Sequence, residues 1–211
     1  MSEEFKKIES SYALSGIPIV HKGSHLFNFE NKYGKFGTTK FWDTMISLAK
    51  TLLEEPKKFP QFVFLLGQPG NGKTHFLVGL YRALIYQLGY SHGDGAVFYT
   101  FGSLNAEIIS GFKDNVPIRS AMSGITTARW IFLDDFTASE RILKANSLEQ
   151  TILRDLFLDR YDSGKFLITT SNFTSVELLA EMDRMFGDYI VSRLHASKII
   201  QFPSVDLRKV R

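Results

Sequence analysis

Residues Gly67–Thr74 read Gly-Gln-Pro-Gly-Asn-Gly-Lys-Thr, a glycine followed after four residues by Gly-Lys-Thr. This spacing is that of a phosphate-binding loop. An apolar stretch of strand length, Gln61–Leu66, precedes the loop, and apolar residues at helical spacing follow it over His75–Ile85. A strand, a glycine loop and a helix in this order favour nucleotide binding over the alternative, a glycine-rich turn followed by a surface lysine.

The residue types within this loop suit the chemistry. Gly67, Gly70 and Gly72 allow the backbone to curl around an anion with several N–H groups pointing inward. Lys73 supplies a cation for the β- and γ-phosphates of ATP, and Thr74 offers a hydroxyl to Mg²⁺. The start of the following helix adds partial positive charge. The predicted nucleotide-binding residues are therefore Gly67, Gln68, Pro69, Gly70, Asn71, Gly72, Lys73 and Thr74.

Composition indicates an ordinary globular domain. The chain has 211 residues, of which 44% are hydrophobic and 22% charged, and it has no cysteine. Without cysteine there is no disulfide or thiolate zinc site, and the five scattered histidines do not form a metal-binding cluster. No apolar run approaches the roughly 20 residues of a membrane helix, and the first residues lack a signal-peptide core, so we expect a cytoplasmic protein with no membrane partner. The net charge of +3 permits a polyanionic partner without requiring one.

The chain divides into a predicted arm, residues 1–40, and a domain, residues 41–211. Thr38 and Thr39 are placed to cap a helix that runs to about Glu55. Apolar runs predict four more strands, at Ala96–Phe101, Trp130–Asp134, Phe166–Thr170 and Lys198–Phe202. Helices are expected around Ser103–Ile109 and over Leu148–Tyr161, with short helices and loop in Gly111–Thr127. Strands alternating with helices predict an α/β fold with a five-stranded parallel sheet and helices on both faces.

Two of these strands end in polar residues of the kind that serve catalysis. Asp134 and Asp135 close the third apolar run, and ligands in open α/β sheets lie beyond the carboxyl ends of strands. We assign Asp134 to Mg²⁺ and Asp135 to polarising an attacking water, against the alternative of a simple helix cap. Asn172 follows the fourth run. If that strand lies between the other two, its amide would emerge between Lys73 and Asp134, where it can orient water; a turn asparagine is the alternative.

The order of these motifs resembles the AAA+ ATPases, and among them the DnaC and DnaI helicase loaders and the related IstB transposition helpers. The similarity covers about residues 15–211. It is carried by the loop with His75 after its threonine, and by these further stretches: Ser15-Gly-Ile-Pro18, Leu26-Phe-Asn-Phe-Glu30, Phe132-Leu-Asp-Asp135, Thr170-Ser-Asn172, Ile190-Val-Ser-Arg-Leu194 and Phe202-Pro-Ser-Val-Asp-Leu-Arg208.

The resemblance implies roles for further residues. Arg193 matches the arginine finger, which reaches the γ-phosphate bound by a neighbouring subunit, and Arg208 matches the second-sensor arginine. His75 joins the nucleotide-binding set, and Arg184 is a second candidate for contact across a subunit boundary. The chain ends just after the fifth predicted strand, so we expect an AAA+ core without the helical lid. Asp135 stands where most AAA+ proteins have Glu, although Asp-Asp is usual among the loaders.

The resemblance further implies an ATPase that assembles head-to-tail and acts with single-stranded DNA and a replicative helicase. Loaders usually carry a helicase-binding domain, whereas about a dozen residues precede the matching region here. The alternatives are an IstB-like helper on duplex DNA and a nucleotide-gated adaptor with little turnover. A small-molecule kinase is disfavoured because no Arg-rich insertion is present, and a GTPase because no Asn-Lys-x-Asp tetrapeptide is present. Lys113 and Arg119 are candidates for phosphate contact, or are simply solvated.

Overall fold

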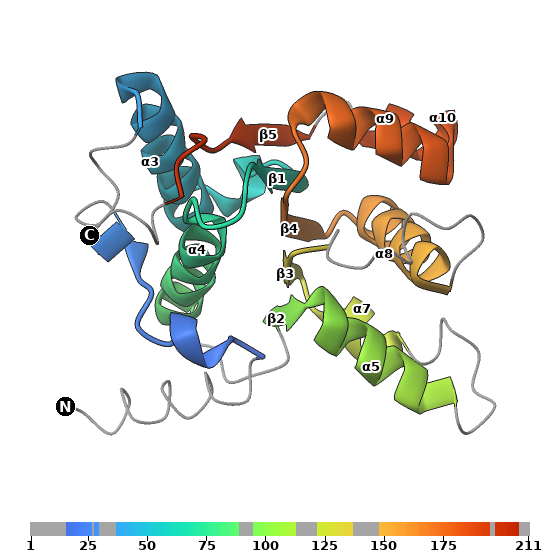
Figure 1. Cartoon of the computed structure of the whole chain (residues 1–211). Coiled ribbons are helices and arrows are strands. Elements are labelled where there is room, and N and C mark those ends of the chain that lie inside the picture. The colour runs from blue at the N-terminus through green and yellow to red at the C-terminus, as the bar shows by residue number, and fades with distance from the viewer. Residues whose placement is uncertain are drawn as a thin grey trace.

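Five strands form one fully parallel sheet in the spatial order β2-β3-β4-β1-β5 (Figure 1). The computed structural model describes residues 16–26, 28–29, 37–88, 95–112, 122–136, 148–194 and 197–206. The strands are β1 Phe62–Leu66, β2 Ala96–Thr100, β3 Trp130–Asp134, β4 Phe166–Ser171 and β5 Lys198–Gln201. The predicted α/β class and the parallel sheet are confirmed.

Helices cover both faces of the sheet, as predicted (Figure 1). One face carries α3 Thr39–Glu54 and α4 Lys73–Leu88; the other carries α5 Phe101–Phe112, α7 Ser123–Thr127, α8 Leu148–Ser163, α9 Ser175–Phe186 and α10 Asp188–Leu194. Side chains alternate along each strand, so Val63 and Leu65 of β1 pack toward α3 and α4, while Phe64 packs toward α8. Every residue of β1 is buried, which explains the continuous apolar run in the sequence.

Helix ends differ by a few residues from the prediction. The Thr38 hydroxyl caps α3 by accepting a hydrogen bond from Phe41 N at 3.2 Å. Helix α5 begins at Phe101, immediately after β2, because the Thr100 hydroxyl accepts from Ser103 N at 3.1 Å and caps the helix without a loop. The predicted Phe101 end of the second strand is therefore wrong by one residue. Lys113 and Arg119 lie outside the described residues.

Residues 16–26 and 28–29, which we call the amino-terminal segment, lie against α4 (Figure 1). The segment contains one short 3₁₀ helix, Ile19–His21. Ile17 and Phe29 are buried in the core between α3, α4 and the sheet. A second 3₁₀ turn, Pro56–Lys58, joins α3 to β1. Within the described ranges, none of the helices is long and apolar enough to cross a membrane.

Candidate active site

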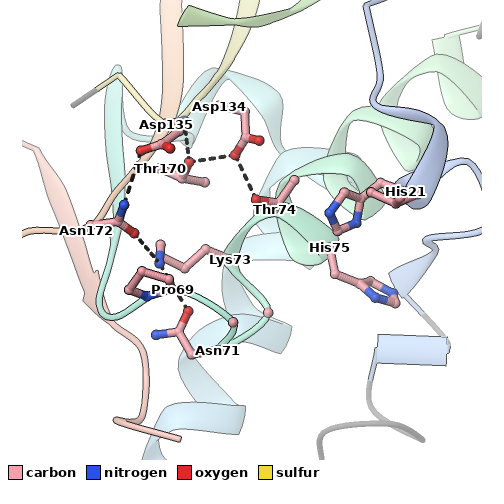
Figure 2. A pocket seen from close by; sticks show the side chains of 13 residues that line it. His21, Pro69, Asn71, Lys73, Thr74, His75, Asp134, Asp135, Thr170 and Asn172 are labelled. Atoms are coloured by element: carbon pink, nitrogen blue, oxygen red, sulfur yellow. Dashed lines mark hydrogen bonds between the residues drawn. The ribbon is translucent and has the colours of Figure 1, made fainter. Parts of the chain in front are cut away.

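The sheet order brings three strand ends together. Strand β4 lies between β3 and β1, which is the condition under which Asn172 was expected to reach the phosphate loop. The loop after β1 and the ends of β3 and β4 meet around a cavity of about 490 Å³ (Figure 2). The cavity is lined by Val20 and His21, by Pro69, Gly70, Asn71, Gly72, Lys73, Thr74 and His75, by Asp134 and Asp135, and by Thr170 and Asn172.

The loop is wound around the side chain of Lys73. The Lys73 ammonium donates to the carbonyls of Gly67 at 2.5 Å and Gln68 at 2.9 Å, and to the side-chain oxygens of Asn71 and Asn172, both at 3.2 Å. The carbonyls of Gly67 and Gln68 thus bind the Lys73 ammonium, and neither residue lines the cavity. Gly67 has a φ of 136°, and a Cβ there would lie 2.5 Å from Asn71 Nδ2, so only glycine fits this turn.

A buried threonine links the two acids. Asp134 is 7% exposed, and its Oδ1 accepts from the Thr74 hydroxyl at 2.9 Å and from the Thr170 hydroxyl at 2.7 Å. Thr170 Oγ1 in turn accepts from Asp135 N at 2.7 Å. One hydroxyl therefore orients the Asp134 carboxylate and fixes the backbone of Asp135 (Figure 2). Thr170 was given no role from the sequence. The feature that could have indicated one is its hydroxyl near the end of a strand that neighbours the strand ending in Asp134.

Asp135 stands in a strained and partly buried position. Its φ of 55° is the one positive value at a non-glycine residue in the described part of the chain. Burial raises the pKa of its carboxyl above the ordinary value, the charge of Asp134 raises that pKa further, and the Lys73 ammonium opposes the rise. A carboxylate with a raised pKa is a stronger base, as a water-polarising group requires.

Asn172 contacts both the Lys73 ammonium and the Asp135 carboxylate. Its Oδ1 accepts from Lys73 Nζ at 3.2 Å, and its Nδ2 donates to Asp135 Oδ1 at 3.4 Å. The amide therefore lies between Lys73 and Asp135, whereas the sequence had predicted a position between Lys73 and Asp134. The difference is one residue along the loop after β3.

The residues present fit a nucleotide with Mg²⁺. Thr74 Oγ1 and Asp134 Oδ1 are 2.9 Å apart, and both are the hard oxygen ligands that Mg²⁺ prefers. No group of three or more His, Asp or Glu side chains suited to a metal occurs among the described residues. A metal held by Thr74 and Asp134 would thus take its other ligands from phosphate and water, which is the usual arrangement for Mg²⁺.

Arg193 lies apart from these groups. It is on α10, where Nη1 donates to Tyr189 O at 2.6 Å and the guanidinium carbon is 3.5 Å from the Tyr189 ring centroid and 5.1 Å from that of Tyr161. It is not among the residues that line the cavity of this subunit. Arg184 pairs with Glu181 at 2.6 Å on α9. Arg208 lies outside the described residues.

Val20 and His21 were not predicted as site residues from the sequence. Both line the cavity, although they precede the phosphate loop by more than forty residues. No spacing rule connects them to the loop, and only the fold brings the amino-terminal segment beside α4.

None of the family models or curated proteins compared with the sequence matches it. Solved structures do match. A crystal structure of the DnaC helicase loader has a TM-score of 0.68 at 16% identity, over 88% of this chain and 99% of that one. The crystal structure of DnaI has a TM-score of 0.59 at 18% identity, over 79% of this chain and 84% of the DnaI chain. The replication initiator DnaA bound to AMPPCP and single-stranded DNA has a TM-score of 0.58 at 19% identity, over 81% of this chain and 50% of the DnaA chain.

The arrangement of strands and helices is therefore the AAA+ core fold of these structures. The resemblance read from the sequence motifs is thereby confirmed for the fold. At sequence identities of 16–19%, the similarity concerns the arrangement of strands and helices.

Proposed function

We propose that this chain binds and hydrolyses ATP with Mg²⁺ and acts as an AAA+ helicase loader of the DnaC type. The observation that carries the proposed ATP binding and hydrolysis is the meeting of Lys73, the Thr74–Asp134 pair, Asp135 and Asn172 at one edge of the sheet. These groups come from three separate strand ends, yet each contacts the next. A cation, a pair of metal-binding oxygens, a base and a water-orienting amide are the parts that phosphoryl transfer to water requires.

Each residue has a defined task in the proposed reaction. Lys73 binds the β- and γ-phosphate oxygens and neutralises their charge. Thr74 and Asp134 would hold Mg²⁺, which would supply further positive charge beside the phosphates. Asp135 accepts a proton from the attacking water, since burial raises the pKa of its carboxyl. Asn172, held between Lys73 and Asp135, orients that water toward the phosphate.

We further propose that Arg193 completes the site of a neighbouring subunit. Its guanidinium is stacked on Tyr189 at the surface of α10 rather than lining its own cavity. A fixed guanidinium stabilises charge that develops on the transferred phosphoryl group. A head-to-tail assembly, in which α10 of one subunit faces the cavity of the next, would supply it.

The proposed partners are single-stranded DNA and a replicative helicase. The proposal is supported by the fold similarity to the DnaC helicase loader and to a DnaA structure that holds single-stranded DNA. ATP turnover measured with single-stranded DNA, with duplex DNA and without DNA tests this choice. Stimulation by single strands supports the loader; stimulation by duplex alone favours an IstB-like helper, and no turnover in any condition favours a nucleotide-gated adaptor.

A subunit-mixing experiment tests the shared site. Lys73→Ala keeps Arg193 but has no usable pocket, whereas Arg193→Ala keeps the pocket but has no finger. In a mixture, some interfaces join the intact nucleotide pocket of the Arg193→Ala variant to the intact Arg193 of the Lys73→Ala variant. Activity should therefore exceed the sum of the two variants alone. Because one transition-state arginine is worth about 10³-fold or more in turnover, partial restoration is measurable. If the variants co-assemble and no activity returns, Arg193 does not act across subunits.

A further inference from the structure

One face of α4 is built to hold the amino-terminal segment. His75, Gly79 and Arg82 are spaced four and three residues apart, so they share this face. All three contact residues of the segment: His75 Nε2 lies 2.7 Å from Asn28 Oδ1, Arg82 Nη1 donates to His25 Nε2 at 2.8 Å, and Gly79 faces Leu26. The face thus contacts the segment over two turns of helix.

The His75 contact is specific in its hydrogen bonding. Its Nε2 lies 2.7 Å from Asn28 Oδ1 and 3.2 Å from His25 O. The Asn28 amide has its orientation fixed, because Nδ2 donates to Gly23 O at 2.8 Å and Oδ1 accepts from His25 N at 2.9 Å. Both partners of His75 Nε2 are therefore acceptors, so that nitrogen carries the proton and donates to the segment.

The close approach at Gly79 shows how tightly the segment is seated. A Cβ at this position would lie 3.0 Å from the backbone nitrogen and from Cδ2 of Leu26. Any side chain there would press against the backbone of the segment, so glycine in the middle of α4 allows the contact. Phe29 then continues into the core, with its ring centroid 5.4 Å from that of His75.

The same segment supplies part of the cavity wall. Val20 and His21 line the cavity, four to eight residues before the contacts with α4. Figure 2 shows the His21 ring directed toward Thr74, whereas the His75 ring turns away from Lys73 and the acids, toward the segment. His75 directly follows Thr74 in the chain, so α4, which begins at the end of the phosphate loop, also contacts the segment that carries Val20 and His21.

We propose that His75 is a positioning residue: it fastens the amino-terminal segment to α4 and so holds Val20 and His21 at the nucleotide cavity. This inference rests on the proposed nucleotide binding. It assigns to His75 a mechanical role, through Asn28 and His25, in place of direct contact with the phosphates. Loss of the contact lets Val20 and His21 move away from the cavity and weakens nucleotide affinity, while Lys73, Asp134 and Asp135 stay in place.

Two variants that break the contact test this proposal, a third restores the donor, and a fourth controls for a general effect. His75→Leu removes the donor, and Asn28→Ala removes the acceptor at a residue that does not line the cavity. His75→Gln restores a donor, and Thr51→Ala, which removes an exposed hydroxyl bond on α3, is the matched control. The first readout is the rate of trypsin cleavage at Lys22, which is exposed within the segment. The second is the binding of AMPPCP, together with the KM and kcat for ATP.

We expect His75→Leu and Asn28→Ala each to raise the rate of cleavage at Lys22 and to weaken AMPPCP binding, both by about 10-fold. KM should rise in parallel while kcat stays within about twofold of the parent. His75→Gln should recover most of both effects, and Thr51→Ala should show neither.

An unchanged Asn28→Ala variant would overturn the proposal, because the segment would then be held without this contact. A loss of kcat in His75→Leu beside a silent Asn28→Ala would also overturn it, since His75 would then act directly on the substrate. If the parent itself fails to bind AMPPCP, the proposed function fails. Cleavage at Lys22 without nucleotide would still report separately on the contact. Should His75→Leu not fold, Asn28→Ala alone decides.

Discussion

Replacing Thr170 by Val should disable the site while keeping the shape of the strand. The Thr170 side chain is 1% exposed and makes two hydrogen bonds of 2.7 Å, to Asp134 Oδ1 and from Asp135 N. Valine leaves the Asp135 N–H without its partner, which costs about 1–3 kcal/mol, and removes a donor from a carboxylate, which contributes about 1.5–3 kcal/mol. The added methyl regains roughly 0.8 kcal/mol through burial.

The expected net loss of unfolding free energy is therefore about 2–4 kcal/mol, and at about 2–4 °C for each kcal/mol Tm should fall by roughly 5–15 °C. Turnover should fall by about 10–100-fold, because a group that orients a metal-binding carboxylate is worth that much. Urea denaturation and steady-state ATPase assays measure the two effects on the same preparation.

Thr169→Val is the matched control for this experiment. Thr169 is the neighbouring residue of β4, is equally buried at 1%, and donates at 2.8 Å to Leu133 O, outside the site. Its loss should cost about 1 kcal/mol or less and leave turnover nearly unchanged. If Thr170→Val and Thr169→Val lose the same stability and the same activity, Thr170 does not organise the acids and the reasoning is refuted.

Three further changes follow from the same geometry. Lys73→Ala removes the ammonium that the loop encloses, so binding of an ATP analogue measured by titration should weaken by about 100-fold; parent-like affinity would rule out this loop as the site. Asp135→Asn should keep ATP binding and lose hydrolysis, measured as bound nucleotide that persists unhydrolysed, and equal turnover in variant and parent would contradict the base assignment. Tyr189→Leu removes the ring that the Arg193 guanidinium stacks on but leaves the guanidinium itself, so turnover should stay within about 10-fold of the parent. Arg193→Ala should lose about 10³-fold in turnover, and equal losses in the two variants would indicate a structural role for Arg193.

The phosphate loop and the polar residues at the strand ends were predictable, because the loop follows from local spacing and the strand ends from the rules of parallel sheets. The phosphate loop must follow a strand and begin a helix, and parallel strands end at one edge of the sheet, so Asp134, Asp135 and Asn172 had to lie near Lys73 once the strand order was known. That order was a condition of the prediction, since apolar runs identify strands without indicating their neighbours. The structure supplied it with β4 between β3 and β1.

Contacts between distant segments could not be read from any pattern. His75 meets Asn28 across 47 residues, and Thr170 meets Asp135 across 35. Each contact depends on side-chain direction at one position, and the sequence records only that a histidine or a hydroxyl is present. The start of α5 was missed for a similar reason, because the hydroxyl of Thr100 replaces the loop that a strand-to-helix transition normally needs.

The backbone conformation at Asp135 also limits which residue types this position accommodates. With φ at 55°, the position tolerates Asp, Asn and Gly far better than longer residues, for which the left-handed region is strained. Glutamate would preserve the charge and still be a poor replacement, because its added methylene displaces the carboxylate from the Asn172 amide while its backbone resists the turn. The backbone conformation thus favours a short side chain at position 135, and Asn is the uncharged substitute that keeps both this conformation and the size of the Asp135 side chain.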